Sequence, residues 1–176
     1  NVEASIGDSL VIEAEDITVE AINRTEKPLR SGERANLRGA SGGLADLPLS
    51  NTSYTQFTSD TLVKVGDGVQ LTTVSGDREK PVKLALLALN DIEAWDYVLL
   101  DSGGVIALPI AFSVINGEIN TAAVEVGGQA AFQSDGDIDL SARTDARLNS
   151  QTQVSTYGLA GAGWGGSGAF LNADNL

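Results

Sequence analysis

The chain has 176 residues, and its 24 acidic and 11 basic side chains give a formal net charge of −13. Such an acidic chain argues against nucleic acid or an anionic membrane as a partner, because both attract basic surfaces. It contains no Cys and no His, which excludes disulfides, thiol chemistry, a Ser-His-Asp triad and a His-ligated zinc site.

The first elements are two alternating segments, VEASIGDSLVIEA (2–14) and EDITVEAINRTEKPL (15–29). Apolar and polar residues alternate in both with a period of two, which is typical of half-buried strands. Within the first segment, Gly7 and Asp8 give a turn signal that separates two short strands. The segment that follows, about 27–47, is more charged and richer in Gly, and we predict a loop that leaves the main structure.

The middle of the chain repeats the opening pattern as VKVGDGVQLTTVS (63–75). Next comes VKLALLAL (82–89), whose composition suits a helix as well as a strand. Its strand-rich context favours a strand, and a helix stays open as the alternative. The stretch SGGVIALPIAFS (102–113) then matches the earlier SGGLADLPLS (41–50).

The last part of the chain shows the pattern a third time, as VEVGGQAAFQSDG (124–136). The alternating GDIDLSARTDARL (136–148) echoes the segment at 15–29, including its Asp-Ile pair. The small-residue run YGLAGAGWGGSGAFLN (157–172) stands where the earlier copies have Leu-Pro. We interpret it as a tight coil crossing, because it lacks the ending of a phosphate-binding loop.

These similarities define a threefold repeat with anchors at fixed spacing. The glycines Gly7, Gly66 and Gly127 are 59 and 61 residues apart, and Pro48 and Pro109 are again 61 apart. We therefore divide the chain into repeats 1–61, 62–122 and 123–176. A following copy of the chain would place its first anchoring glycine nearly in phase, so we expect one unit of a longer tandem array or polymer.

The pattern predicts an all-β protein, specifically a parallel β-helix or solenoid. Few aromatic residues are present, 5% of the chain, so separate sandwich cores are less favoured than a narrow interior of small and branched side chains. The signatures of propeller blades are absent. At roughly 20 residues per coil, we expect about nine coils and a rise of roughly 43 Å along the axis.

Taken together, the Gly-Asp-Gly openers, GDIDLSARTDARLNSQTQVSTYGLAGAG (136–163) and SGGVIALPIAFSVING (102–117) resemble the large filamentous adhesins of Gram-negative bacteria. These are the filamentous-haemagglutinin-like and leukotoxin-like repetitive exoproteins. The resemblance implies a right-handed parallel β-helix, an extracellular or cell-surface location, and a role as a fibrous stalk or adhesin. It implies no catalytic residues in such repeats.

Possible ligand contacts gather in DIEAWDY, where Asp91, Glu93, Trp95 and Tyr97 share one face of an alternating strand. Aromatic rings beside carboxylates are typical of carbohydrate-binding surfaces and of glycosidases. A solvated strand face with two exposed aromatics is the simpler interpretation. We therefore expect no enzyme and no catalytic residues.

The Asp-rich turns offer a second candidate site, for calcium. Carboxylates at Asp8, Asp67, Asp135 and Asp137 could bind Ca²⁺, which prefers oxygen ligands. However, the Gly-Gly-x-Gly-x-Asp repeat of calcium-binding β-rolls is missing. Ordinary turns are the simpler interpretation, and we expect neither a cofactor nor a metal site.

Two functional hypotheses follow from the sequence. In the first, the chain is a structural repeat whose partners are copies of itself, stacked end to end. In the second, the 27–47 segment or the Trp95–Tyr97 face binds a glycan or a host surface. The longest apolar stretch is broken by charged, Gly and Pro residues, so we expect no membrane insertion.

Overall fold

The structure, a computed structural model, describes residues 1–29, 35–46, 50–76 and 81–176. It is built from parallel β-strands. Their bounds are β1 (Val2–Ile6), β2 (Val11–Ala14), β3 (Ile17–Lys27), β4 (Leu37–Asp46), β5 (Ser50–Val65), β6 (Gln70–Thr73), β7 (Lys83–Ala107), β8 (Ile110–Val126), β9 (Ala131–Ser134), β10 (Asp137–Gly161) and β11 (Trp164–Asn175).

The strands form three parallel sheets, in which each strand pairs with its equivalent in the next repeat. The orders are β1-β5-β8-β11, β3-β7-β10 with β4 also on β7, and β2-β6-β9. The chain thus winds round a common interior and stacks successive turns on one another. The predicted all-β fold, a parallel solenoid, is confirmed.

The expectation of about nine coils is wrong, because each repeat makes one coil. Thr61 pairs with Val2 and Ala122 pairs with Thr61, so successive layers are 59 and 61 residues apart. The alternation does not reveal where a strand ends, and β7 and β10 run for 25 residues each. Three layers at about 4.8 Å give a rise of about 14 Å instead of 43 Å.

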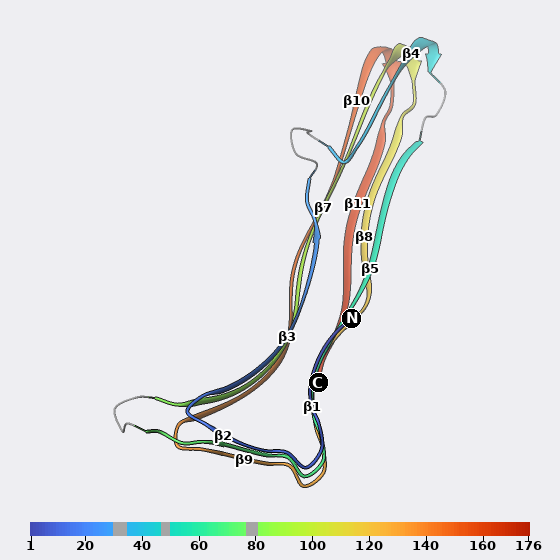
Figure 1. Ribbon diagram of the computed structural model, residues 1–176. Helices are drawn as coiled ribbons and strands as arrows, with labels where there is room; N and C mark the ends of the chain where they lie inside the picture. Colours follow the sequence, from blue (N-terminus) through green and yellow to red (C-terminus); the bar gives the residue numbers. More distant parts are fainter. Residues whose placement is uncertain (30–34, 47–49, 77–80) are drawn as a thin grey trace.

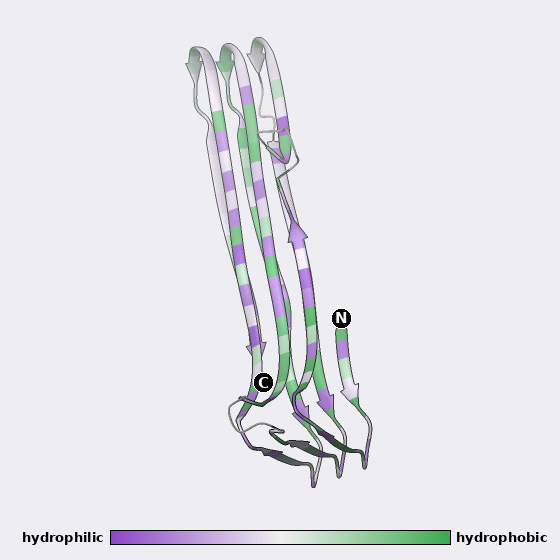
Figure 2. Cartoon of the chain, turned by 60° about the vertical axis from the view of Figure 1, so that its left-hand side comes forward, coloured by the Kyte–Doolittle hydropathy of each residue, from purple (hydrophilic) through white to green (hydrophobic). Residues whose placement is uncertain are grey.

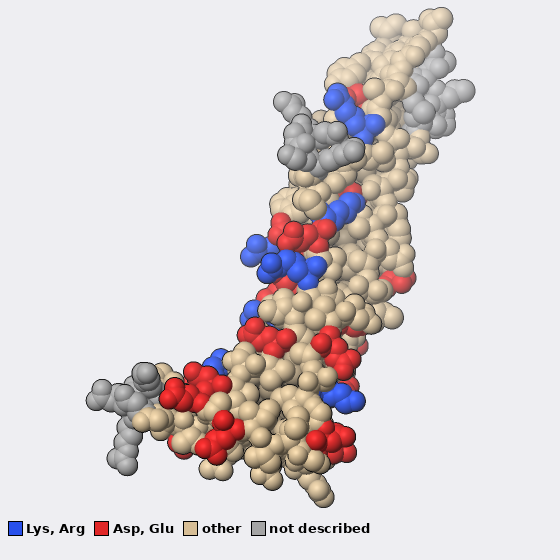
Figure 3. All heavy atoms as spheres, in the orientation of Figure 1, with Lys and Arg blue, Asp and Glu red and all other residues tan. Residues whose placement is uncertain are grey.

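The coil has a long leg and a short foot (Figure 1). In the leg, the β3/β4-β7-β10 sheet faces the β5-β8-β11 sheet, and the β2-β6-β9 sheet forms the foot. Figure 2 shows the three coils side by side, with the N-terminus in one outer coil and the C-terminus in the other. Acidic side chains gather on the foot, whereas both signs of charge alternate along the leg (Figure 3).

The anchoring glycines stack on one another at the corner before the foot. Gly66 N donates to Ile6 O at 2.9 Å and Gly127 N donates to Val65 O at 2.8 Å. A Cβ on Gly66 or Gly127 would lie 2.8 or 2.7 Å from the backbone nitrogen of the layer beneath. Glycine is needed there because the layers approach closely. The repeat register predicted from these glycines is confirmed.

The second anchor also stacks, as far as it is described. Gly42 and Gly43 pair with Gly103 and Gly104 in β7, and Pro109 O accepts a hydrogen bond from Trp164 N at 2.9 Å in the turn between the leg sheets. Pro48 lies outside the described residues.

The stretch 82–89 is a strand, as predicted, since β7 begins at Lys83. The predicted loop at 27–47 is wrong over most of its length. Lys27 still pairs with Ala94 in β3, and from Leu37 the chain returns as β4, paired with Val98 onward. Among the described residues of this stretch, Pro28, Leu29, Ala35 and Asn36 lie outside the strands, and residues 30–34 are not part of the described structure. A loop was predicted because β4 is rich in Gly and Ala, which are uncommon in strands.

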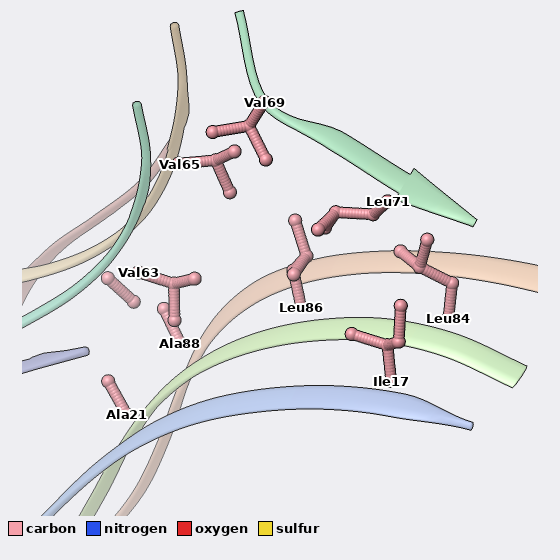
Figure 4. Close-up of a cluster of buried hydrophobic side chains, with 10 residues drawn as sticks. Ile17, Ala21, Val63, Val65, Val69, Leu71, Leu84, Leu86 and Ala88 are labelled. Carbon is pink, nitrogen blue, oxygen red and sulfur yellow. The ribbon is translucent and has the colours of Figure 1, made fainter. Parts of the chain in front are cut away.

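The main core lies where the leg meets the foot (Figure 4). Its fully buried side chains are aliphatic, and Leu71, Leu84 and Leu86 each have no exposed surface. No aromatic side chain is buried among the described residues. The expected interior of small and branched residues is therefore what this structure contains.

The middle layer should contribute most to stability, and two equivalent leucines test this. Leu86 is fully buried, whereas Leu140, its partner in β10, is 47% exposed. For an unassembled chain, Leu86→Ala should lower the free energy of unfolding by about 2–5 kcal/mol. Leu140→Ala should cost half of that or less. Urea denaturation at low protein concentration measures both, and equal losses would contradict the layer assignment.

Candidate functional site

The four predicted contact residues lie on the outer face of β7. Asp91, Glu93, Trp95 and Tyr97 are partly or fully exposed, whereas the intervening Ile92, Ala94 and Asp96 are each 1% exposed. The alternation inferred from the sequence is thus present. The long parallel pairing with β10 holds this stretch of β7 straight, so its outer side chains form one row.

Each of the four side chains has a partner on this face. Trp95 Nε1 donates to Glu93 Oε1 at 2.9 Å, and Arg24 Nε donates to Asp91 Oδ2 at 3.1 Å. The Tyr97 hydroxyl donates to Gln153 Oε1 on β10. The row is therefore a polar surface of hydrogen-bonded pairs that together reach all three layers.

Three grooves border this row, and two of them include Leu29 in their lining. Among the described residues, the strand pairing of the first coil with β7 stops at Lys27–Ala94 and resumes at Leu37–Val98. One groove is lined by Pro28, Leu29, Glu93 and Trp95. A second is lined by Leu29, Arg38, Tyr97, Leu99, Asp101, Gln153, Ser155 and Tyr157. A third is lined by Leu89, Asp91, Glu93, Arg143, Thr144, Asp145, Ala146 and Arg147.

Asn36 resumes the hydrogen bonding of the first coil to β7, one residue before β4 begins. Its backbone N–H donates to Tyr97 O at 2.8 Å, and its side-chain oxygen accepts from Tyr97 N at 2.8 Å. The amide side chain thus replaces the peptide group of the missing strand. Sequence reasoning missed this residue, because an Asn in a charged, Gly-rich stretch is an ordinary loop residue.

The interior of the leg holds a polar cluster around Asp96 that sequence reasoning also missed. The Asp96 carboxylate has no exposed side-chain surface and accepts from Lys27 Nζ at 2.7 Å. Ser53 Oγ and Ser113 Oγ donate to it at 2.8 and 2.7 Å. The one available signal was an Asp in the apolar phase of the alternation; its partners lie far away in the sequence.

The environment of Asp96 keeps it ionised. Burial raises its pKa, but the hydrogen bonds from Lys27, Ser113 and Ser53 outweigh burial, and the pKa lies below its usual value. A buried carboxylate held as an anion by three donors is a poor proton acceptor. Its arrangement suits the joining of β3, β5, β7 and β8 across the interior.

A second buried polar cluster, centred on Asn90, lies in the interior between the Asp96 cluster and the foot. Asn90 is fully buried; its side-chain oxygen accepts from Ser59 Oγ at 2.8 Å and from the Thr61 hydroxyl. Its Nδ2 donates to Ser59 O at 3.1 Å and to Thr121 O at 2.9 Å. Every hydrogen-bonding group of this amide is engaged, so it ties the two leg sheets together.

The Asp-rich turns link layers by hydrogen bonds. Asp8 Oδ1 accepts from Asp67 N at 2.9 Å, and Asp67 Oδ1 accepts from Gly128 N at 2.7 Å. Asp135 accepts from Ser75 N at 3.3 Å, and Asp137 N donates to Val82 O at 3.1 Å. In the described part of the chain, no three His, Cys, Asp or Glu side chains come close enough to hold a metal ion.

A scan against protein-family models gives no match, and neither the curated proteins nor the solved structures include one that matches. Within the described ranges we find no helix with the length and apolar character of a bilayer span.

The Lys27–Asp96 pair should behave as a buried ion pair. Lys27→Met leaves the Asp96 charge without its counter-ion, and we expect a loss of about 3 kcal/mol, the lower end for buried pairs because Lys27 is 33% exposed. Adding Asp96→Asn removes the orphaned charge and should restore much of the stability. Urea denaturation of the two single variants and the double variant measures this, and additive losses would contradict it.

The same pair predicts a dependence on pH. The pKa of Asp96 is lower in the folded than in the unfolded state, so its ionisation stabilises the fold above about pH 4. This contribution should disappear as the pH falls from about 4 through the lowered folded pKa. The Lys27→Met/Asp96→Asn variant should lack that part of the acid destabilisation. Denaturation curves between pH 2 and 7 would show it as a shallower slope.

Proposed function

We propose that this chain is a structural unit of a secreted bacterial surface filament or adhesin, and that it stacks end to end as a β-solenoid fibre. The observation that carries the proposal is the position of the last strand. Asn175 stacks on Ala122, which stacks on Thr61 and then on Val2. This column repeats the same parallel pairing from layer to layer, so a further coil can follow the same path. In a stack of separate copies, Asn175 and Leu176 occupy the positions that Val2 and Glu3 of the next copy would take, so one of these two ends has to move aside.

The third layer supports stacking because its interior side chains are incompletely covered. Ile138 and Leu140 are 45% and 47% exposed, although Leu84 and Leu86 in the same columns have no exposed surface. The outer strands also present backbone groups along one edge, which is a template for further pairing. A second copy would cover the apolar side chains and satisfy these groups together.

The cell-surface setting rests on the resemblance to filamentous adhesins. That resemblance implied a parallel solenoid, which is the architecture found. The acidic surface and the polar outer faces suit a protein that remains in water along its whole length.

Electron cryo-microscopy of the concentrated chain tests the proposal. We expect filaments with a layer spacing of about 4.8 Å and an axial rise of about 14 Å per chain. In filaments, Leu140→Ala should approach the cost of Leu86→Ala, because stacking buries Leu140. Monomeric particles at all concentrations would overturn the stacking proposal.

Carbohydrate or host-surface binding is the second candidate function, and the two grooves that Leu29 lines favour it. Trp95, Tyr97 and the 64%-exposed Tyr157 lie along them, next to Arg38 and Asp101. Aromatic rings with a few polar groups are typical of ligand sites.

A paired substitution tests this second function. If a glycan binds here, Trp95→Ala with Tyr97→Ala should lower its affinity about tenfold or more, because two stacking surfaces are removed. Phe170→Ala is the matched control, an aromatic 62% exposed on β11 in the opposite sheet. A glycan array with the unaltered chain identifies the ligand. No bound glycan, or equal loss in the control, would contradict the hypothesis.

A further inference from the structure

The two outer layers carry opposite charges at matching positions of the coil. In one outward-facing column, Arg24 of β3 pairs with Asp91 of β7, which pairs with Asp145 of β10. Two residues along, Glu26 pairs with Glu93, which pairs with Arg147. The first layer therefore presents Arg then Glu, and the third layer presents Asp then Arg.

We propose that copies of the chain join head to tail, with β10 of one copy pairing with β3 of the next in the register that continues the coil. This inference rests on the proposed stacking and specifies its polarity and register. Asp145 of one copy then lies opposite Arg24 of the next, and Arg147 lies opposite Glu26. Opposite charges on directly paired strands attract, and like charges repel.

The charged groups at this junction are exposed and can reach a neighbouring copy, although some already have partners within the chain. Asp145 Oδ2 lies 3.1 Å from Arg143 Nη2, and Glu26 Oε1 lies 4.0 Å from Arg24 Nε. The side chains of Arg24, Glu26 and Asp145 are 63%, 62% and 55% exposed. Arg24 contacts Asp91 through Nε, which leaves its terminal nitrogens for a second carboxylate. Arg147 is exposed, and no described residue forms an ion pair with it.

The same register also matches the interior. Ile138 of one copy lies over Ile17 of the next, because both share a column with Leu84. Leu140 lies over Val19 in the same way, through Leu86. A slip of one residue would turn these apolar side chains outward and bring charged residues into the interior.

A slip of two residues keeps every side chain on the same face of the sheet, but Arg24 and Glu26 no longer lie opposite charges of the other sign. A slip in one direction places Arg143 on Arg24 and Asp145 on Glu26, both like-charged pairs. A slip in the other direction places Arg147 on Arg24, which is a repulsive pair. It gains a single attractive pair, Arg143 with Glu20. The continuing register is the one in which both Arg24 and Glu26 meet an opposite charge, so the charges select it.

The foot opposes association in this register. Asp137 would lie near Asp16, and Asp135 near Glu15, on the surface where acidic side chains gather (Figure 3). Exposed pairs of this kind are individually weak and screened by salt. We therefore assign the affinity to backbone pairing and apolar burial, and the choice of register and polarity to the leg charges.

Complementary charge reversals test the junction. Arg147→Glu and Glu26→Arg each turn an attraction into a repulsion, and each alone should raise the critical concentration for assembly about tenfold. A 1:1 mixture of the two variants should assemble nearly as well as the unaltered chain, because each variant's third layer then matches the other's first layer. A chain with both changes should also assemble.

The matched control is Lys64→Glu, a change of the same size at an exposed position near the C-terminal end of β5. Lys64 lies in the middle layer, paired with Ser5 of β1 and Glu125 of β8, so it does not face a neighbouring copy. Sedimentation of polymer at about 50 mM salt gives the critical concentrations, and thermal unfolding checks that each variant folds. At 1 M salt, where the screening length is about 3 Å, the differences between variants should largely disappear.

The outcomes separate this inference from the stacking proposal. If the unaltered chain does not polymerise, the proposed function fails. If it polymerises and the two reversals behave like Lys64→Glu, stacking stands and the register is wrong. If each reversal weakens assembly but mixing does not restore it, the third layer does not meet the first, and head-to-tail polarity is overturned.

Discussion

The parallel backbone ladder between successive coils is the constraint on which the rest of this structure depends. Every strand in the middle layer takes its hydrogen bonds from equivalent strands on both sides, so each coil has to follow the path of the coil beneath it. The corner glycines follow from this requirement. A Cβ on Gly127 would lie 2.7 Å from Asp67 N, and a larger residue would force the layers apart and break the ladder on both sides of the corner.

Polar layers inside the leg then fix which residues stack. Passing up β7, the aliphatic core at Leu84 and Leu86 gives way to the buried amide of Asn90 and the carboxylate of Asp96, and then to Val98 and Leu100. A two-residue slip between facing sheets would place Asn90 or Asp96 among aliphatic side chains without their donors. Buried ion pairs add little net stability, but an unmatched one is costly. The polar layers therefore make one register far more favourable than its neighbours.

The parts of this architecture that the sequence reveals are those governed by residues close in sequence or repeated along it. The glycine spacing predicts the layer register, and the alternation predicts the outer row from Asp91 to Tyr97. The number of coils is not predictable in this way, because a period of two is the same in a short strand as in a 25-residue one. The Gly103–Gly104 pair looks like a turn, yet β7 passes through it.

The contacts across the interior could not be predicted from the sequence for a different reason. Asp96 differs locally from a solvated charge only because it falls in the apolar phase of the alternation. Nothing near it in the sequence points to Lys27, which is 69 residues away. Their meeting depends on where β3 ends, because Lys27 is the last residue of that strand. Just beyond it, Pro28 and Leu29 line a groove with Glu93 and Trp95, so the end of β3 is next to both a buried ion pair and an exposed surface.

In this architecture the same interaction, the pairing of one layer with the next, stabilises the folded chain and would hold the fibre together. A chain of three layers contains two layer-to-layer interfaces, and its outer layers are each covered on one side. In the fibre that we propose, every chain gains one more interface of the same kind, and the junction then resembles the contact between any two coils. The stability of a linear stack is approximately a sum of such nearest-neighbour contributions. Stability and polymerisation would therefore be coupled through protein concentration, and the exposed edge that enables growth is also what leaves an isolated chain incompletely stabilised.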